Sequence, residues 1–294
     1  MNGKGSTVRR LDVQARTVVK FLINHRGKRR AIRRAYAYRA IGRLGATIIG
    51  FDGPGATYLV RPDDLLGQWA FEGKGFDQDK LGRVMEHLGA HGTFIDVGAN
   101  VGVTTLPALC RFGFERAIAI EPSPDNVRLL RAALALNDVE GLVEVVAAGA
   151  SASQGSMELE LSPDNSGDHR IRMTSTDGAY GEAERASVRV KVIRLDDLDV
   201  DPADVGLLWI DAQGHEGQIL AGARKFLARK VPTVIEYWPY GLRRAGGIDS
   251  LHGLIRDHFE TVLDLTTEEI FPASGVAELA RVYAGTASTD ILLR

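Results

Sequence analysis

From residue 93 onward, short apolar runs alternate with segments whose apolar positions recur every three or four residues. Short apolar runs between turn residues predict buried strands, and the longer period predicts amphipathic helices. Helices are expected at about 100–112, 124–137 and 216–229. Because helical connections place successive strands parallel, the pattern indicates an α/β fold with a parallel central sheet. Its predicted strands are Thr93–Val97, Arg116–Glu121, Val143–Ala148, Gly206–Asp211 and Thr233–Tyr237.

The C-terminal part predicts a helix near 249–258 and two further strands, Thr261–Leu265 and Asp290–Leu293, which we expect to pair as a terminal hairpin. Together with the five parallel strands they predict a Rossmann-like, doubly wound, seven-stranded sheet. Residues 156–161 and 187–193 alternate as strands do, and a polar, glycine-bearing loop, 162–186, lies between them. Long polar loops in compact domains are often binding loops or lids.

Upstream of the sheet, the pattern divides the chain further. Residues 46–60 predict one or two short strands broken at Gly53-Pro54-Gly55, a turn follows at 71–75, and a helix follows at about 77–88. We therefore expect a basic helical extension at 1–45, a strand and helix cap at 46–92, and the α/β core domain at 93–294.

Charge is distributed unevenly along the chain. Residues 1–44 hold 13 of the 36 Lys and Arg residues and one acid, Asp12, although the net charge is -2. Such a segment could pack on the core as a solvated helix, contact an anionic membrane surface or polyanionic substrate, or bind nucleic acid. No recognised nucleic-acid module frames it, so no nucleic-acid partner is expected.

Composition bounds the remaining possibilities. With 294 residues, 45% of them hydrophobic, the chain can bury one large core or two modest ones. Its single cysteine, Cys110, cannot form an intrachain disulfide, which suits a reducing compartment. No apolar run has the length of a membrane span and no secretory signal is evident. We expect a cytoplasmic protein, which could also bind peripherally to the inner face of a membrane.

The first predicted strand runs into a glycine turn, Phe94-Ile-Asp-Val-Gly-Ala-Asn-Val-Gly102. Gly98 and Gly102 allow a tight turn with close approach of the backbone to a ligand. Asn100 stands between them, and asparagine tolerates left-handed backbone angles. Glu121 ends the second strand, where a carboxylate can accept hydrogen bonds from the two hydroxyls of a ribose.

The spacing of this turn selects the cofactor. A dinucleotide fingerprint requires G-x-G-x-x-G, whereas this chain places Asp96 two residues before the first glycine, where an acid would repel a pyrophosphate. A cofactor with a positive charge and no phosphate suits the turn, and S-adenosylmethionine has both properties. The alternative, that the glycines only pack helix on strand, leaves Glu121 unexplained.

Further candidates end the other strands, because ligands of open α/β sheets bind at the carboxyl ends of the strands. Ala147 and Ala148 are small enough to leave room for an adenine. Asp211 could orient or deprotonate a substrate hydroxyl, or else cap the next helix or hold the cofactor amino group. His215 is either a second candidate base or a surface residue without a catalytic role. Two further candidates end the fifth strand: Glu236 as a catalytic acid or base and Tyr237 as a substrate contact.

Two expectations complete the site. In the polar loop, Asn165, Asp168 and Arg170 are expected to contact substrate or close over the cofactor, with Arg170 able to neutralise an acidic substrate; the alternative is a solvated hairpin. Asp211, Glu216 and Glu236 carry the hard oxygen ligands that Mg²⁺ prefers, but nothing in their spacing sets a geometry and no metal is predicted. Glu216 stands in the first turn of its helix, where an acid is structural.

Three motifs in order resemble the FkbM family of S-adenosylmethionine-dependent methyltransferases: Phe94–Gly102, Ala119-Ile-Glu-Pro-Ser-Pro-Asp-Asn126 and Trp209-Ile-Asp-Ala-Gln-Gly-His-Glu216. The resemblance spans about residues 70–240 and implies a class I methyltransferase fold and O-methylation, often of a sugar or polyketide-type hydroxyl. Relatives often carry an acid where this chain has Gln213, so the resemblance implies no role as a base or metal ligand for that position. Carried over by position, it implies cofactor contacts from Asp96, Gly98, Asn100, Gly102, Glu121, Ser123, Asn126, Asp211 and Gln213.

The sequence therefore predicts an S-adenosylmethionine-dependent O-methyltransferase that acts on a hydroxyl of a sugar, glycolipid or secondary metabolite. The alternatives are an N-methyltransferase and a non-catalytic protein that binds an adenosine ligand. The intact Asp96, Glu121 and Asp211 argue against a degenerate site.

Overall fold

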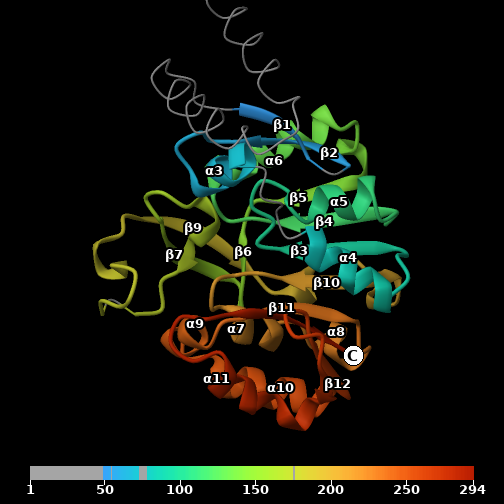
Figure 1. The fold of residues 1–294 in the computed structure, drawn as a ribbon, viewed down its shortest axis with the longest axis vertical. Helices are drawn as coiled ribbons and strands as arrows, with labels where there is room; N and C mark the ends of the chain where they lie inside the picture. Colours follow the sequence, from blue (N-terminus) through green and yellow to red (C-terminus); the bar gives the residue numbers. More distant parts are fainter. Residues whose placement is uncertain (1–48, 54, 73–77, 175) are drawn as a thin grey trace, which may run out of the picture.

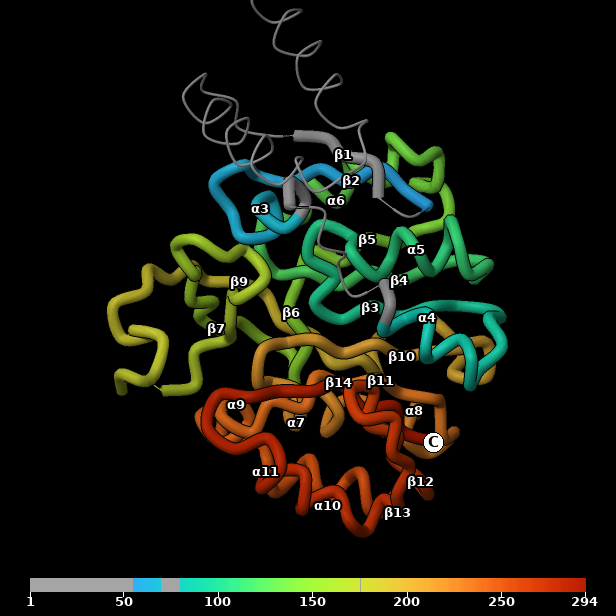
Figure 2. Tube along the Cα trace, viewed as in Figure 1, coloured from blue at the N-terminus to red at the C-terminus, as the bar shows by residue number. Residues whose placement is uncertain are grey.

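The computed structural model describes residues 49–53, 55–72, 78–174 and 176–294 (Figures 1 and 2). The basic extension predicted at 1–45 lies outside the described residues. In the described part, eight strands form the central sheet in the order β13-β12-β14-β11-β10-β3-β4-β5. The parallel strands are β3 (Thr93–Val97), β4 (Arg116–Ile120), β5 (Val143–Val146), β10 (Val205–Ile210) and β11 (Thr233–Tyr237).

The C-terminal edge of this sheet is antiparallel. Strand β14 (Thr289–Leu293) inserts between β11 and β12 (Thr261–Asp264), as the predicted pairing of the last two strands requires. The predicted count of seven strands is wrong by one, because β13 (Ile270–Pro272) adds an eighth strand beside β12. Three residues, of which Ile270 and Pro272 are exposed, carry too little apolar pattern to predict a strand.

Helices cover both faces of the sheet, which is therefore doubly wound. Strand residues alternate between faces: Ile95 packs in one buried cluster with α7, α8 and α10, while Phe94 packs in another with α4. The helices are α4 (Gln78–His87), α5 (Thr105–Cys110), α6 (Pro124–Leu136), α7 (Glu216–Ala221), α8 (Arg224–Ala228), α9 (Pro239–Arg244), α10 (Ile248–His258) and α11 (Leu279–Val282). None of the helices described has the length and hydrophobicity needed to cross a lipid bilayer.

A local signal sets the start of α6, whereas a tertiary contact separates α7 from α8. Ser123 accepts a hydrogen bond from Asn126 N, and Pro124 opens α6 where the helix was predicted to begin. The single helix predicted over 216–229 is instead two, α7 and α8. The break lies at Gly222, where a Cβ would stand 2.3 Å from the carbonyl oxygen of Ser151. The close passage of the chain at Ser151 is a tertiary contact that periodicity does not reveal.

Residues 149–193 build a second, four-stranded sheet in the order β6-β9-β7-β8. The predicted strands are β7 (Gly155–Glu160) and β9 (Ser187–Ile193), paired antiparallel. The two short strands β6 (Gly149–Ala150) and β8 (Arg170–Ile171) lie at the edges. The loop predicted at 162–186 thus contains β8 and two 3₁₀ turns, Ser166–Asp168 and Glu182–Glu184, rather than forming a solvated hairpin.

The N-terminal elements lie at the end of the molecule opposite α10 and α11 (Figure 1). The hairpin β1 (Ile49–Gly53) and β2 (Ala56–Val60) lies on α6, and Thr57 N donates to Asn137 Oδ1 at 2.8 Å. Helix α3 (Leu65–Glu72), which the sequence did not predict, takes up the first two residues of the turn expected at 71–75. Leu65 N donates to the carbonyl oxygen of Asp164, which ties α3 to the second sheet.

Candidate active site

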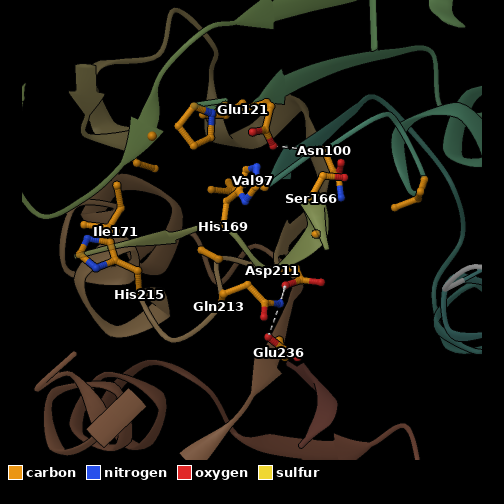
Figure 3. A pocket seen from close by; sticks show the side chains of 18 of the residues that line it. Val97, Asn100, Glu121, Ser166, His169, Ile171, Asp211, Gln213, His215 and Glu236 are labelled. Atoms are coloured by element: carbon orange, nitrogen blue, oxygen red, sulfur yellow. Dashed lines mark hydrogen bonds between the residues drawn. The ribbon is translucent and has the colours of Figure 1, made fainter. Parts of the chain in front are cut away.

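Two adjoining cavities open at the carboxyl ends of β3, β4, β10 and β11. The inner cavity, of about 310 Å³, lies where the order of the parallel strands reverses between β3 and β10, the usual ligand site of open α/β sheets (Figure 3). The outer cavity, of about 760 Å³, extends toward the loop at 162–186. The two cavities share four lining residues: Trp69, Asn165, Gln213 and Glu236.

The glycine turn is held by close contacts within the protein. Gly98 has φ 87°, and a Cβ there would lie 1.8 Å from the carbonyl oxygen of Asp211. Gly102 has φ 93°, and a Cβ there would lie 2.9 Å from Leu130 Cδ1. Both glycines are needed for packing, since Gly98 lets the end of β10 approach the turn and Gly102 lets α6 approach it. Gly98 also lines the inner cavity, so close approach of its backbone to a ligand stays a prediction, whereas Gly102 is not among the described residues that line either cavity. Asn100 adopts φ 50°, which confirms the expected left-handed conformation.

Asp96 lies beneath this turn, fully buried. Its Oδ2 accepts hydrogen bonds from Thr104 Oγ1 at 2.6 Å and Thr105 Oγ1 at 2.5 Å. Burial raises the pKa of Asp96 to about 6, although both threonine hydrogen bonds favour the charged form. Asp96 is not among the described residues that line either cavity, so its predicted cofactor contact is replaced by a role in holding the start of α5.

Glu121 faces the inner cavity from the end of β4. Its Oε2 accepts from Asn100 N at 2.8 Å, and its Oε1 accepts from Ser123 N at 2.7 Å and Asn126 Nδ2 at 3.5 Å. Burial raises the pKa of Glu121 to about 7 against these hydrogen bonds. Ser123 and Asn126 hold the carboxylate rather than line the cavity. Because each carboxylate oxygen has two lone pairs, Glu121 retains capacity to accept further bonds from a ligand.

The inner cavity fits S-adenosylmethionine on the chemistry of its walls. Three carboxylates, Glu121, Asp211 and Glu236, face a cationic ligand, and the wall residue Lys80 forms an ion pair with Asp290. The small residues beyond β5 are Gly149 and Ala150, since β5 ends at Val146 and Ala148 is buried away from the cavity. The predicted place of Ala148 in the cavity wall is therefore wrong, and Gly149 and Ala150 line the cavity instead.

Three hydrogen-bonded side chains lie where the two cavities meet. Gln213 Nε2 donates to Asp211 Oδ1 at 2.7 Å and to Glu236 Oε2 at 2.9 Å (Figure 3). Gln213 has φ 54°, a strained conformation for a residue other than glycine and one that clusters at functional sites. Burial, followed by the charge of Asp211, raises the pKa of Glu236 well above its ordinary value. Asp211 and Glu236 thus lie together as a candidate acid–base pair that Gln213 bridges.

The predicted base His215 lies elsewhere on the inner wall. Its Nε2 is 3.0 Å from Ser151 Oγ, and burial lowers its pKa to about 4, so the ring is neutral at neutral pH. In Figure 3 its ring lies beside Ile171, apart from Asp211 and Gln213. The catalytic assignment of His215 is therefore corrected to a wall residue.

Glu216 is structural, as predicted from its place in the helix. Its Oε1 accepts from Ala212 N at 2.9 Å and Gly214 N at 3.2 Å, which closes the turn after β10. Burial raises the pKa of Glu216 to about 7. In the described part of the chain, no three His, Cys, Asp or Glu side chains are arranged to hold a metal ion.

Tyr237 does not reach either cavity. Its side chain is fully buried, its hydroxyl lies 2.7 Å from His252 Nε2, and the two rings stack. The predicted substrate contact of Tyr237 is wrong, because successive strand residues point to opposite faces and Glu236 takes the cavity side. The next residue, Trp238, lines the outer cavity.

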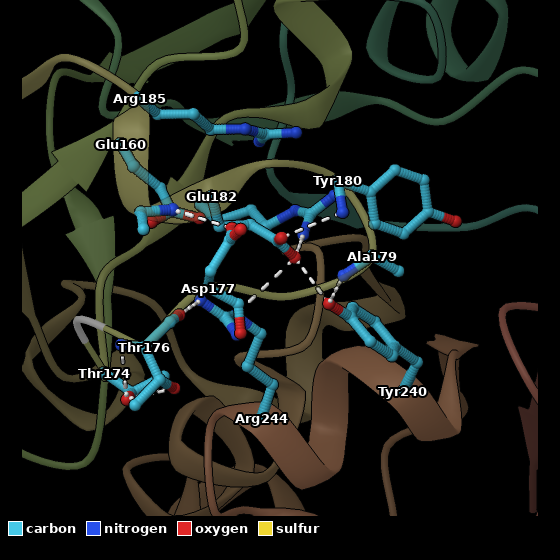
Figure 4. A network of polar contacts seen from close by, with 12 residues as sticks. Glu160, Thr174, Thr176, Asp177, Ala179, Tyr180, Glu182, Arg185, Tyr240 and Arg244 are labelled. Atoms are coloured by element: carbon cyan, nitrogen blue, oxygen red, sulfur yellow. Dashed lines mark hydrogen bonds and ion pairs between the residues drawn. The ribbon is translucent and has the colours of Figure 1, made fainter.

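The polar loop carries a buried ion network instead of free charges (Figure 4). Arg170 donates to Asp168 Oδ1 from Nε at 2.7 Å and to Glu182 Oε1 from Nη1 at 2.9 Å. Its guanidinium also lies over the rings of Tyr180 and Trp238, at 5.0 and 4.6 Å from their centroids. Arg170 and Asp168 line the outer cavity, but the charge of Arg170 is already compensated, so the expected neutralisation of an acidic substrate is not supported.

Glu182 is the hub of this network. It accepts from Tyr240 Oη at 2.7 Å and Tyr180 N at 2.9 Å, and Arg244 lies 3.6 Å away. Burial opposes ionisation, but these hydrogen bonds and the Arg244 charge lower the pKa of Glu182 to about 2. Asn165 bonds locally, accepting from Gly167 N at 3.0 Å, and lines both cavities.

Sequence reasoning missed several lining residues: Trp69, His169, Tyr180, Gly149 and Ala150. Trp69 and Tyr180 come from segments outside the parallel strands and reach the site only through tertiary packing. His169 carried a usable signal, since it stands two residues before Ile171 in an extended segment of the expected binding loop.

Several known methyltransferases are similar to this chain. The methyltransferase FkbM domain matches residues 96–261. A curated relative, methyltransferase sdnD of Sordaria araneosa, is 28% identical over 177 residues, 51% of this chain and 68% of the relative. Methyltransferase FkbM from Methylobacillus flagellatus KT is a similar solved structure, with TM-score 0.43 and 13% identity over 96% of this chain and 59% of that chain. M. jannaschii TYW2 in complex with AdoMet gives a TM-score of 0.43 and 11% identity over 84% of each chain.

The chain thus spans about three fifths of the length of that solved FkbM protein. The FkbM domain match, in contrast, extends over more than half of this chain and includes the glycine turn, Glu121 and the Asp211–Gln213–Glu236 group. The chain belongs to the FkbM family of S-adenosylmethionine-dependent methyltransferases.

Proposed function

We propose that this protein is an O-methyltransferase that methylates a hydroxyl of a sugar, glycolipid or secondary metabolite. The observation that carries the proposal is the Asp211–Gln213–Glu236 group at the junction of the two cavities. Acids at that junction stand between a cofactor in the inner cavity and an acceptor in the outer one.

The inner cavity would hold the cofactor through the residues of its walls. Glu121 would accept hydrogen bonds from the ribose, and Gly98, Asn100 and Asp211 would line the path toward the junction. When bound, S-adenosylmethionine supplies a methyl group already activated on a sulfonium, so the protein contributes chiefly alignment and proton removal.

Glu236 is the group best suited to take the proton of the acceptor hydroxyl. A general base works best when its pKa lies near the working pH, and burial beside Asp211 moves Glu236 in that direction. The amide of Gln213 would keep the two carboxylates in place, and Asp211 would orient the hydroxyl.

The lining of the outer cavity supports an uncharged, polyhydroxylated acceptor. Trp69, Tyr180 and Trp238 offer aromatic surface, while amides and hydroxyls offer hydrogen bonds; the latter belong to Gln68, Asn165, Gln213, Ser162, Thr286 and Ser288. Aromatic faces combined with planar polar side chains match the apolar faces and hydroxyl edges of a sugar ring. We further propose that the enzyme works in the cytoplasm; contact of residues 1–45 with an anionic membrane surface stays a prediction.

The test is methyl transfer from labelled S-adenosylmethionine to methyl hexosides, alkyl glucosides and catechols, with matched amino sugars as amine acceptors. We expect transfer to a hydroxyl, and a loss of kcat of about 10²- to 10⁴-fold in Glu236→Gln that is much larger than the accompanying change in the cofactor Kd measured by calorimetry. Glu144→Gln, an exposed strand glutamate, is the matched control.

Two outcomes would contradict the proposal. Methylation of amines alone, insensitive to Glu236→Gln, would identify an N-methyltransferase. Tight cofactor binding without transfer to any acceptor would favour a protein that only binds an adenosine ligand.

A further inference from the structure

His169 presents a hydrogen-bond donor of defined position to the inner cavity. Ser162 N donates to His169 Nδ1 at 3.1 Å, so Nδ1 carries no proton. A neutral imidazole must then carry its proton on Nε2. Burial lowers the pKa of His169, which favours the neutral ring despite the nearby charges of Asp64 and Asp168. The described residues provide no hydrogen-bond partner for Nε2, although the side chain lines the inner cavity.

Strand alternation explains why His169 faces this cavity. His169 has extended backbone angles and precedes β8 directly, so residues 169 and 171 project to one side and Arg170 to the other. His169 and Ile171 line the inner cavity, while Arg170 lies in the ion network of the outer one. The loop thus serves both cavities with alternate side chains.

Neighbouring contacts place this donor near the nucleoside end of the inner cavity. A Cβ on Gly149 would lie 3.6 Å from Ile171 Cδ1 and 3.8 Å from Pro122 Cβ, so Ile171 and Pro122, the residue that follows Glu121, both lie close to Gly149. The segment before His169 is anchored to the same region, since Asn126 Nδ2, which also reaches Glu121, donates to the carbonyl oxygen of Ser166 at 3.2 Å.

We propose that His169 is a cofactor-binding residue whose Nε2–H donates a hydrogen bond to the nucleoside half of S-adenosylmethionine. This inference rests on the placement of the cofactor in the inner cavity, not on the identity of the acceptor. It gives the loop at 162–186 a part in cofactor binding: the same ring that accepts from Ser162 N on one side donates to the ligand on the other.

Two substitutions separate the two nitrogens. In His169→Asn, the amide oxygen can replace Nδ1 and keep the Ser162 bond, but nothing replaces Nε2. In His169→Gln, the longer side chain can place its NH₂ near the position of Nε2, at the expense of the Ser162 bond. Calorimetric titration with S-adenosylmethionine and with 5′-methylthioadenosine, which lacks the amino-acid part, reads out binding without turnover.

We expect His169→Asn to raise the Kd of both ligands about tenfold, the effect of losing one hydrogen bond, and His169→Gln to stay within about threefold of the wild type. Thermal melts of the unliganded variants report whether each one folds. The reverse order of the two variants would reduce His169 to an anchor for Ser162 and overturn the proposal, as would unchanged Kd values in both. A loss confined to S-adenosylmethionine would assign the donor to the methionine part and overturn the nucleoside assignment. Since no acceptor is present, failure of the O-methyltransferase proposal would leave this test unaffected.

Discussion

Gly98 and Asp211 meet at the floor of the site: a Cβ at residue 98 would lie 1.8 Å from the carbonyl oxygen of Asp211, and Asp211 N donates to Val97 O at 2.9 Å. The glycine turn and the end of β10, which carries Asp211, are thus one backbone unit. An error in either position would displace both the cofactor wall and Asp211.

Gly98→Ala is therefore expected to destabilise the fold by about 3 kcal/mol or more, because the clash with a backbone atom adds to the strain of a positive φ. The free energy of unfolding in urea measures this. Gly113→Ala is the matched control, since Gly113 has φ 83° but nothing within 4 Å of its Cβ, and it should lose only about 1–2 kcal/mol. Equal losses in the two variants would show that the Asp211 contact adds nothing.

The pH dependence of turnover distinguishes Glu236 from His215 as the base. A base must be deprotonated to act, and the pKa of Glu236 is raised, so kcat is expected to increase with pH through a range well above the ordinary value of 4.5. Rates measured from pH 5 to 9 should show this acidic limb in the wild type and in His215→Asn, but not in the residual activity of Glu236→Gln. If His215→Asn removes the limb instead, His215 is the base after all.

Glu216 makes stability depend on pH in a direction opposite to most acids. Its folded pKa is about 7, above the unfolded value of 4.5, so the folded state holds the proton more tightly. The associated stability is fully present below pH 4.5 and is lost as pH rises toward and through 7. Relative to the wild type, Glu216→Gln should gain about 1–3 kcal/mol between pH 5 and pH 8. Urea unfolding of both proteins at the two pH values tests this, and a gain that is the same at both would contradict the buried carboxylate.

Arg170 is expected to matter more for stability than for charge recognition. Arg170→Ala leaves Asp168 and Glu182 without their shared guanidinium in a buried site, and breaking such a network costs about 3–5 kcal/mol. Arg128→Ala removes an exposed ion pair with Asp125, its side chain being 77% accessible, and should cost about 0.5 kcal/mol or less. Chemical denaturation compares the two. A small effect of Arg170→Ala, together with a selective loss of activity on acidic acceptors, would restore Arg170 as a substrate-binding residue.

Local sequence patterns accounted for most of the elements around the site. The strands β3 and β11 have the predicted bounds, and α6 begins at the predicted residue 124, because each signal lies within a few consecutive residues. Glu121 and Asp211 could be placed at a common edge for the same reason, since the carboxyl ends of parallel strands meet there.

Side-chain direction near strand ends was less predictable. When a strand ends one or two residues earlier than predicted, different residues face the cavity. Strand β5 ends at Val146, so Gly149 and Ala150 line the cavity in place of the predicted Ala148. The same alternation turned Tyr237 toward His252 and left Glu236 at the junction.

The class of fold, the glycine turn, the acids at the strand ends and the family could all be predicted from the amino-acid sequence, since these follow from short-range periodicity and contiguous motifs. The partners of each polar group became clear only from the folded chain. Gln213 joins two acids from different strands, His215 meets Ser151, and Arg170 is neutralised within its own loop. The physical reason is that burial and hydrogen bonding depend on groups far apart in the chain, and these set the pKa and orientation on which the chemistry depends.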